Sequence, residues 1–110
     1  MSTGQDLKQY QWKNRLLLLF GDESTSVYNK QKSIFSQESH ELKERDILIL
    51  KGTKHLERQL NLKNNFSGVI LIGKDGGIKL KEPFVVYPKT IFVLIDGMPM
   101  RRAEMKKAKG

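Results

Sequence analysis

The sequence predicts a three-layer α/β sandwich in which helices flank a mixed sheet of four strands. Three observations lead to this fold class: two short apolar runs separated by a helical segment, a β-hairpin after them, and helix-like segments after the hairpin. Two strands joined by a right-handed helical crossover lie parallel, and the hairpin adds an antiparallel pair. At 110 residues the chain is one domain, and we expect residues 1–13 to be a lead-in and residues 14–108 the single folded domain.

The hairpin is the clearest element of the sequence. Residues 68–81 read GVILIGKDGGIKLK, in which Val69–Ile72 is a β-branched apolar run and Ile78–Lys81 alternates apolar and polar side chains. Between them Lys74–Gly77 supplies residues that tolerate positive φ. The same segment lacks the strand–loop–helix context and the terminal Lys-Ser/Thr of a phosphate-binding loop. We therefore interpret it as a turn.

Two further strands come before the hairpin. Asn14–Phe20 (NRLLLLF) and Asp46–Leu50 (DILIL) are short continuous apolar runs, each followed closely by glycine. Such runs are typical of strands that are covered on both faces of a sheet. Ahead of the first run, Leu7–Lys13 is predicted to be extended, with Tyr10 and Trp12 on the same side.

Capping residues mark the helices between these strands. Ser24–Ser26 offer N-cap hydroxyls for a helix predicted to continue to about Arg45 and to pack on the sheet by one face. Thr53 is placed to cap a short helix, Lys54–Leu60.

The segments after the hairpin complete the layout. Composition alone leaves Lys89–Asp96 open between strand and helix, and we favour a helix because a fifth strand would be unexplained. Pro99 suits the first turn of a final helix, Met100–Lys107. The order strand, helix, strand, helix, hairpin, helix is the thioredoxin-like arrangement, with the β-hairpin in its C-terminal half.

The net charge of +8 is the main compositional signal. It favours anionic partners through steering and counterion release, although a solvated surface that keeps the protein soluble is the simpler explanation. Part of the charge lies in the C-terminal tail, in Arg101, Arg102, Lys106, Lys107 and Lys109. The chain contains no nucleic-acid-binding motif, so a nucleic acid is a less favoured partner.

The sequence contains no cysteine. Disulfides, thiolate nucleophiles and cysteine metal sites are therefore excluded, while the compartment stays open. The first apolar run, Leu16–Phe20, is far too short to span a bilayer, so no membrane span is expected.

Three blocks of the sequence resemble one known family. They are Tyr10–Phe20 (YQWKNRLLLLF), Leu71–Gly77 (LIGKDGG) and Ile95–Met105 (IDGMPMRRAEM). They resemble the domain of unknown function 4174 family, which includes the repeated domains of a vertebrate secreted matrix protein, coiled-coil domain-containing eighty. The resemblance implies a thioredoxin-like fold without established activity, often in exported proteins. It therefore suggests a periplasmic or extracellular location, with a leader absent from this chain. Gly97 stands where the family usually has alanine or a similarly small residue.

In redox-active proteins of this fold, a cysteine pair follows the first strand. Here that stretch is Gly21–Ser26, which has no thiol, and the proline that normally precedes the hairpin is also missing. The hydroxyls of Ser24–Ser26 and the amides at the start of the helix could bind an anion, but Asp22 and Glu23 would repel the anion. We therefore favour helix capping as the role of these hydroxyls. No catalytic residue, cofactor or metal is predicted, since His40 and His55 lack partners at ligand spacing and lie near no obvious carboxylate cluster.

The best candidate site lies between the last two predicted helices. Asp96, Arg101 and Arg102 are close in sequence and could form a clamp for an anion. The simpler explanation, which we favour, is that Asp96 pairs with one of the arginines to lock the bend while Met98 and Met100 fill gaps in the core. The family resemblance implies that Arg15 joins the same network.

Three functions follow from these observations. The first is a redox-inactive binding module for an acidic protein or a polyanion, such as a glycosaminoglycan-like polymer. Its hypothetical binding residues are Arg15, Asp96, Arg101, Arg102, Lys106, Lys107 and Lys109. The second is a cysteine-independent enzyme acting at Asp96, Arg101 and Arg15, and the third is a dimerisation domain that uses a sheet edge. The oligomeric state stays open.

Overall fold

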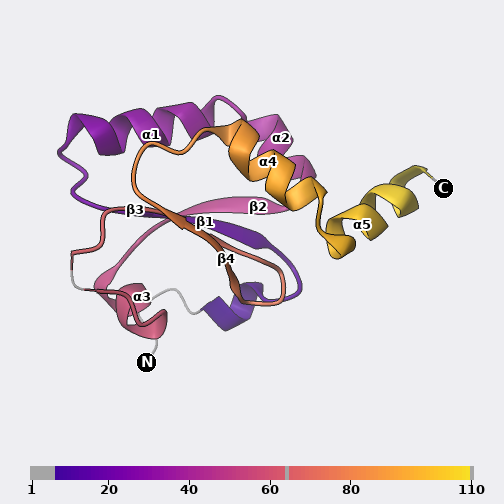
Figure 1. Cartoon of the computed structure of the whole chain (residues 1–110), viewed down its shortest axis with the longest axis horizontal. Coiled ribbons are helices and arrows are strands. Elements are labelled where there is room, and N and C mark those ends of the chain that lie inside the picture. Colours follow the sequence, from indigo (N-terminus) through magenta and orange to yellow (C-terminus); the bar gives the residue numbers. More distant parts are fainter. Residues whose placement is uncertain (1–6, 64, 110) are drawn as a thin grey trace.

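A computed structural model describes the backbone of residues 7–63 and 65–109 and the side chains as far as residue 107. Four strands form one sheet in the order β2-β1-β3-β4 (Figure 1). They are β1 (Arg15–Phe20), β2 (Ile47–Lys51), β3 (Gly68–Ile72) and β4 (Ile78–Glu82). β1 is parallel to β2 and antiparallel to β3, and β3 is antiparallel to β4. The mixed four-stranded α/β fold predicted from the sequence is confirmed.

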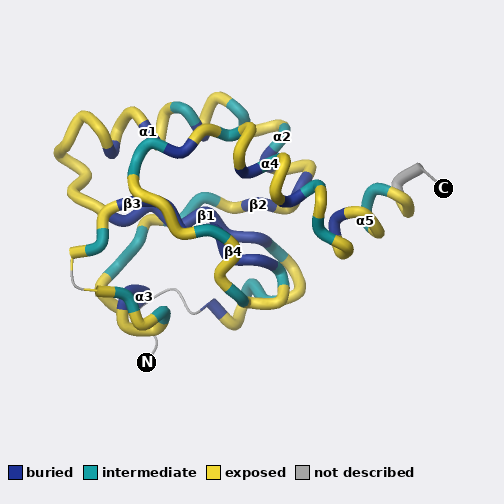
Figure 2. The backbone as a smooth tube through the Cα atoms, viewed as in Figure 1, coloured by how far each residue is buried: buried dark blue, intermediate teal, exposed yellow. Residues whose placement is uncertain are grey.

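Helices cover both faces of the sheet. One face carries α1 (Ser26–Ser36), α2 (Ser39–Glu44) and α4 (Pro88–Asp96), and the other carries the 3-10 helix η1 (Leu7–Tyr10) and α3 (Lys54–Gln59). The central strands β1 and β3 are buried at every residue (Figure 2). Side chains alternate across a strand, so Leu17 and Leu19 pack under the first group of helices, while Leu16 and Leu18 pack under the second.

The last helix, α5 (Pro99–Lys109), extends away from the body of the domain (Figure 1). Pro99 lies in its first turn, as predicted, because proline at the first helical position loses no intrahelical hydrogen bond, and the helix is longer than the predicted Met100–Lys107. The segment before it, α4, is a helix, as favoured. No helix in the described part of the chain is long and apolar enough to cross a membrane.

The predicted helix caps are also confirmed. The Thr25 hydroxyl accepts a hydrogen bond from the Tyr28 amide at 3.3 Å, and the Thr53 hydroxyl accepts one from the Leu56 amide at 3.2 Å. Each cap satisfies one of the amides that a helix leaves without an internal partner.

Two predictions about local structure are wrong. The single helix expected from Ser24 to about Arg45 is two helices, because the chain turns at Gln37 and Glu38 without glycine or proline. The turn redirects the chain so that Leu42 packs into the same core as Phe35. The lead-in is not extended: η1 brings Leu7 and Tyr10 to the second core cluster, whereas Trp12 adopts positive φ and is exposed.

Candidate functional site: an ion-pair cluster at the root of α5

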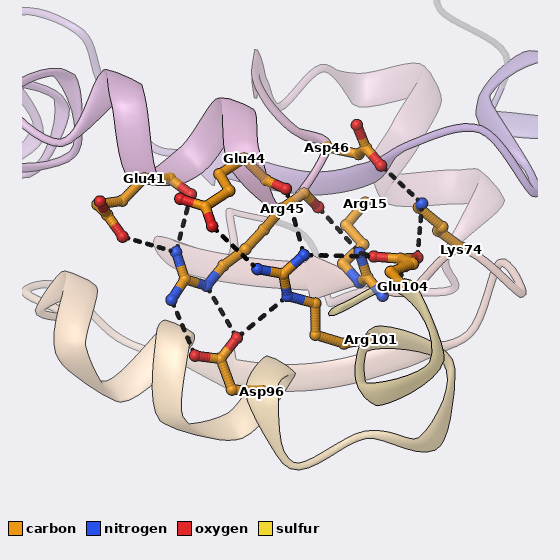
Figure 3. Close-up of polar contacts among 9 residues, drawn as sticks. All are labelled: Arg15, Glu41, Glu44, Arg45, Asp46, Lys74, Asp96, Arg101 and Glu104. Carbon is orange, nitrogen blue, oxygen red and sulfur yellow. Dashed lines mark hydrogen bonds and ion pairs between the residues drawn. The ribbon is translucent and has the colours of Figure 1, made fainter. Parts of the chain in front are cut away.

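Charged side chains meet where α5 joins the body (Figure 3). They come from the start of β1, the residue before β2, the hairpin turn, the end of α2, the end of α4 and the first part of α5. The members of this cluster are Arg15, Glu41, Glu44, Arg45, Asp46, Lys74, Asp96, Arg101 and Glu104. We call it the root cluster. It joins segments that are distant in sequence, and it fixes the direction in which α5 leaves the domain.

Arg15 is the innermost member of the root cluster. It is the first residue of β1, its backbone amide donates to the Asp46 carbonyl, and it is only 2% exposed. Its Nη1 donates to the Arg45 carbonyl at 2.9 Å and to Glu104 Oε1 at 3.2 Å, and its Nη2 donates to Glu104 Oε2 at 3.2 Å. This two-bonded pairing fits the planar guanidinium to the carboxylate, which keeps the buried charge compensated.

Glu104 is shared between Arg15 and a second cation. Lys74, at the hairpin turn, donates to Glu104 Oε2 at 2.7 Å and to Asp46 Oδ2 at 2.8 Å. Burial by itself raises the pKa of Glu104, but the hydrogen bonds from Lys74 and Arg15 outweigh it, so the pKa lies below its ordinary value. Burial likewise lowers the pKa of Lys74, yet its bonds to Asp46 and Glu104 leave that pKa raised.

Asp96, at the end of α4, binds two arginines. Arg45 donates to it from Nε at 3.0 Å and from Nη2 at 2.8 Å, and Arg101 donates from Nε at 3.3 Å. The hydrogen bonds from Arg45 are the main reason that the pKa of Asp96 is lowered. The Arg45 guanidinium also lies 4.3 Å from the centre of the Phe92 ring. This part of the root cluster ties α4 to the turn after α2.

The structure divides the predicted site residues into two groups. Arg15, Asp96 and Arg101 are brought together, and Asp96 pairs with Arg101, as the simpler explanation held. Arg102, together with Lys106 and Lys107, is exposed instead. The side chain of Lys109 lies outside the described residues.

The other part of that explanation, that Met98 and Met100 fill gaps in the core, is wrong. Met98 is half-buried, but Met100 is 40% exposed, so the two methionines do not both fill the core. They line a cavity of about 330 Å³ beside Arg15 and Lys74.

Sequence reasoning missed the other six members of the root cluster, which are Glu41, Glu44, Arg45, Asp46, Lys74 and Glu104. A signal for Glu104 was present, because it stands three positions after Arg101 on one helix, where side chains meet. Arg45 had a local signal too, since Glu41 stands four positions before it, but nothing local points to Lys74, because its partners lie on other elements.

The chemistry of the root cluster is that of a structural lock. Its two most engaged carboxylates, Asp96 and Glu104, have lowered pKa values and are ionised at neutral pH. A general acid or base needs a pKa close to the working pH, which is the opposite shift. Because Arg15 and Arg101 already bind carboxylates of the same chain, their donors are directed inward rather than to a ligand.

The segment after β1, Gly21–Ser26, is a capped turn. Asp22 Oδ1 accepts from the Ser24 hydroxyl at 2.7 Å and from its amide at 2.8 Å, and these bonds lower the pKa of Asp22. Thr25 caps α1 from the same turn. A cavity of about 490 Å³ opens here between the ends of β1 and β2.

One statement about the histidines is wrong. His40 does lie beside carboxylates, because its ring and the side chains of Glu41 and Glu44 place ligand atoms within 4.8 Å of one another. Both glutamates are already engaged, Glu41 with Arg45 at 3.0 Å and Glu44 with Arg101 at 3.6 Å.

Comparison with known proteins gives one result. The model of the family described as Domain of unknown function (DUF4174) matches the chain in two stretches, residues 6–53 and 51–104. Both β1 and the root cluster fall within the matched residues. No curated protein and no solved structure matches the sequence.

Proposed function

This chain belongs to the DUF4174 family, and we propose that it is a redox-inactive interaction module that binds an acidic protein or a polyanion through the exposed cations of α5. One observation carries the proposal: adjacent arginines of α5 have opposite environments. Arg101 is 5% exposed and bound to carboxylates, whereas Arg102 is exposed. The root cluster thus anchors one side of α5 and turns its other cations to solvent.

Helix geometry explains this division. Arg101 and Glu104 are three positions apart and share the side of α5 that faces the body. Arg102 and Lys106 are four positions apart and share another side, with Lys107 next to it. Within the described residues, no ion pair reaches Arg102, Lys106 or Lys107. These three side chains form the surface that we call the α5 basic face.

The distribution of the acidic groups supports the same proposal. Most carboxylates of the described chain are consumed by internal ion pairs: Glu23, Glu41, Glu44, Asp46, Glu57, Asp75, Asp96 and Glu104. The excess of positive charge is therefore displayed outward, by exposed lysines and by the α5 basic face. A polyanion that binds there releases its counterions, so affinity falls as salt rises.

The alternatives are supported less well. An enzyme acting at Asp96, Arg101 and Arg15 would need free hydrogen-bond donors or a carboxylate of raised pKa. Instead, Arg15 pairs with Glu104, and Asp96 pairs with both Arg45 and Arg101.

The strand order and the parallel β1–β2 pair support the thioredoxin-like assignment. In this chain a capped turn occupies the positions at which redox-active proteins of that fold have cysteines.

Retention on immobilised heparin tests the proposal. The triple variant Arg102→Gln, Lys106→Gln, Lys107→Gln removes the α5 basic face. A matched control, Lys30→Gln, Lys32→Gln, Lys89→Gln, removes the same charge from exposed positions on α1 and α4. We expect the first variant to elute at clearly lower salt than the control, with a shallower dependence of affinity on salt. Equal retention of the two variants would mean that only net charge matters, and it would overturn the proposal.

A further inference from the structure

The two edges of the sheet are protected very differently. β4, one edge, carries Lys79, Lys81 and Glu82, and its pairing with β3 is irregular near Ile72. Charges and bulges of this kind keep an edge from pairing with another chain. β2, the opposite edge, reads Ile-Leu-Ile-Leu before its first charge, Lys51, and its register with β1 is regular.

The outer side of β2 has unpaired backbone groups. In a parallel pair, alternate residues direct both their N–H and their C=O to the neighbouring strand. Asp46 and Gly52 bond to β1, at 2.8 Å to the Arg15 amide and 2.7 Å to the Leu19 carbonyl, so the even-numbered residues face β1. Ile47, Ile49 and Lys51 therefore direct their groups away from the sheet. No hydrogen bond among the described residues reaches them.

An apolar hollow runs beside this open edge. A cavity of about 540 Å³ lies between β2 and α2, with an apolar lining of Leu42, Ile47, Leu48 and Ile49. Leu48 is 39% exposed on the other face of the strand. A strand added to β2 would find apolar contacts for its side chains on both faces, as well as main-chain hydrogen-bond partners.

We propose that β2 is a docking edge for an extended segment of an acidic partner protein, which joins the sheet as a fifth strand. This inference rests on the proposed function and narrows the partner to a protein. The β2 edge fits a segment in which every second residue is apolar and Asp or Glu stands at each end, because lysines lie at both ends of the edge. Lys43 lines the hollow without an ion pair in the described chain, and Asp46 of the same lining is neutralised by Lys74. At the other end Lys51 and Lys54 pair with Glu23 at 3.0 Å and with Glu57 at 3.9 Å, and a carboxylate of the docked segment would compete for these two lysines.

Charge also favours an acidic segment over a second copy of the chain as the strand that pairs with β2. Each copy has a net charge of +8, and antiparallel self-pairing would add the lysines of one copy to those of the other. An acidic segment is attracted by the same groups. The turn just before β2 is also tied to the start of α5, through Glu44–Arg101 directly and through Asp46–Lys74–Glu104. An acidic extension of the docked strand would reach α5 from there.

The test uses the full chain and a synthetic peptide in which Val-Thr-Val-Thr-Val is flanked on each side by two glutamates. Hydrogen exchange of single amides is followed by NMR as peptide is added up to millimolar concentration. We expect the amides of Ile47, Ile49 and Lys51 to become protected. Those of Leu48 and Leu50, which already face β1, should change little. Absence of binding, or binding without protection of the outward amides, would overturn the proposal.

A pair of variants separates strand pairing from charge. Leu48→Lys adds a cation, which attracts the peptide, but removes an apolar contact at the edge. Ile78→Lys makes the same change on β4 at a residue of similar exposure, 44% against 39%. We expect Leu48→Lys to weaken peptide binding about threefold or more, and Ile78→Lys not to weaken it. Equal or tighter binding by Leu48→Lys would show that charge alone holds the peptide.

Two further outcomes are distinguished by the same samples. Protection of the outward amides that appears without peptide and grows with protein concentration would assign the edge to a second copy and overturn the proposal. If the outward amides respond to peptide but heparin retention does not distinguish the α5 variant from its control, the edge stands and the proposed role of α5 fails.

Discussion

Arg15 and Glu104, which are 89 positions apart, are joined by two hydrogen bonds of 3.2 Å. The first belongs to β1 and the second to α5, so the pair ties the first strand to the last helix. Arg15 is almost wholly buried, whereas the side chain of Glu104 is 25% exposed. The carboxylate thus closes the buried charge off from solvent, and the helix that carries it is held in one direction.

Removing the charge of Glu104 should destabilise the domain. Glu104→Gln keeps the shape of the side chain but leaves Arg15 and Lys74 without their shared carboxylate. We expect a loss of about 2–4 kcal/mol in the free energy of unfolding, measured by urea denaturation, since an uncompensated buried charge is costly. Glu82→Gln, on exposed β4, is the control and should change it by less than about 0.5 kcal/mol. Equal effects would show that the root cluster contributes nothing.

The adjacent arginines of α5 should separate stability from binding. Arg101→Ala removes a buried guanidinium that binds Asp96 and the Glu44 carbonyl, each at 3.3 Å, and we expect a cost of about 2–4 kcal/mol. Arg102→Ala should stay within about 0.5 kcal/mol of the parent, because the side chain is exposed. Thermal unfolding measures the stability of both variants. Retention on heparin, compared under conditions in which both variants are folded, measures their binding. A destabilised Arg102→Ala would contradict the division.

Acid should weaken the root cluster. The pKa values of Asp96 and Glu104 are lowered in the folded protein, Asp96 by hydrogen bonds from Arg45 and Glu104 by bonds from Lys74 and Arg15 against the effect of burial. The folded state therefore binds fewer protons than the unfolded chain at these sites. Their contribution is present above the ordinary carboxyl pKa of about 4 and is lost as the pH falls through the lower, folded values.

This pH dependence can be measured with a variant already described. The difference in unfolding free energy between the parent and Glu104→Gln should be largest at neutral pH and should shrink in acid, as the parent's carboxylate is protonated. A difference that is constant down to acid pH would show that the charge of Glu104 is not the source of its effect.

Two glycines should respond to alanine with opposite signs. A Cβ at Gly52 would overlap the ring of Phe20, which is buried, and we expect a loss of about 1–3 kcal/mol. Gly97 has φ of −85°, and a Cβ there would meet only carbonyl oxygens at 3.6 and 3.7 Å. Because alanine restricts the unfolded chain, Gly97→Ala should stabilise the protein by about 0.4–1 kcal/mol. Urea midpoints measure both, and a destabilised Gly97→Ala would contradict this description of the helix end.

Local signals predicted most of the fold. The continuous apolar runs located β1 and β2, the hairpin located β3 and β4, and Thr25, Thr53 and Pro99 located three helix starts. The division between α1 and α2 was not predictable in the same way. No glycine or proline marks Gln37 and Glu38, and the turn there is required by packing on the sheet rather than by local preference.

The candidate site was predictable only in part. The Asp96–Arg101 pair lies within one short segment, so its residues could be read together. The partners of Arg15 and Lys74 depend on which elements the fold brings side by side, and neither spacing nor composition carries that information. The exposure of Arg102 beside the buried Arg101 followed from the direction of α5, which the root cluster itself determines.

The Arg15–Glu104 pair also has a consequence for how the molecule is made. A ribosome delivers β1 early, but the carboxylate that neutralises its arginine emerges only with the last helix. Until then the nascent chain holds a cation at the place where the central strand must leave water, so the sheet cannot close stably around it. Completion of this domain therefore waits for the synthesis of α5, and a chain that stops before α5 should be a substrate for proteolysis rather than a shortened module.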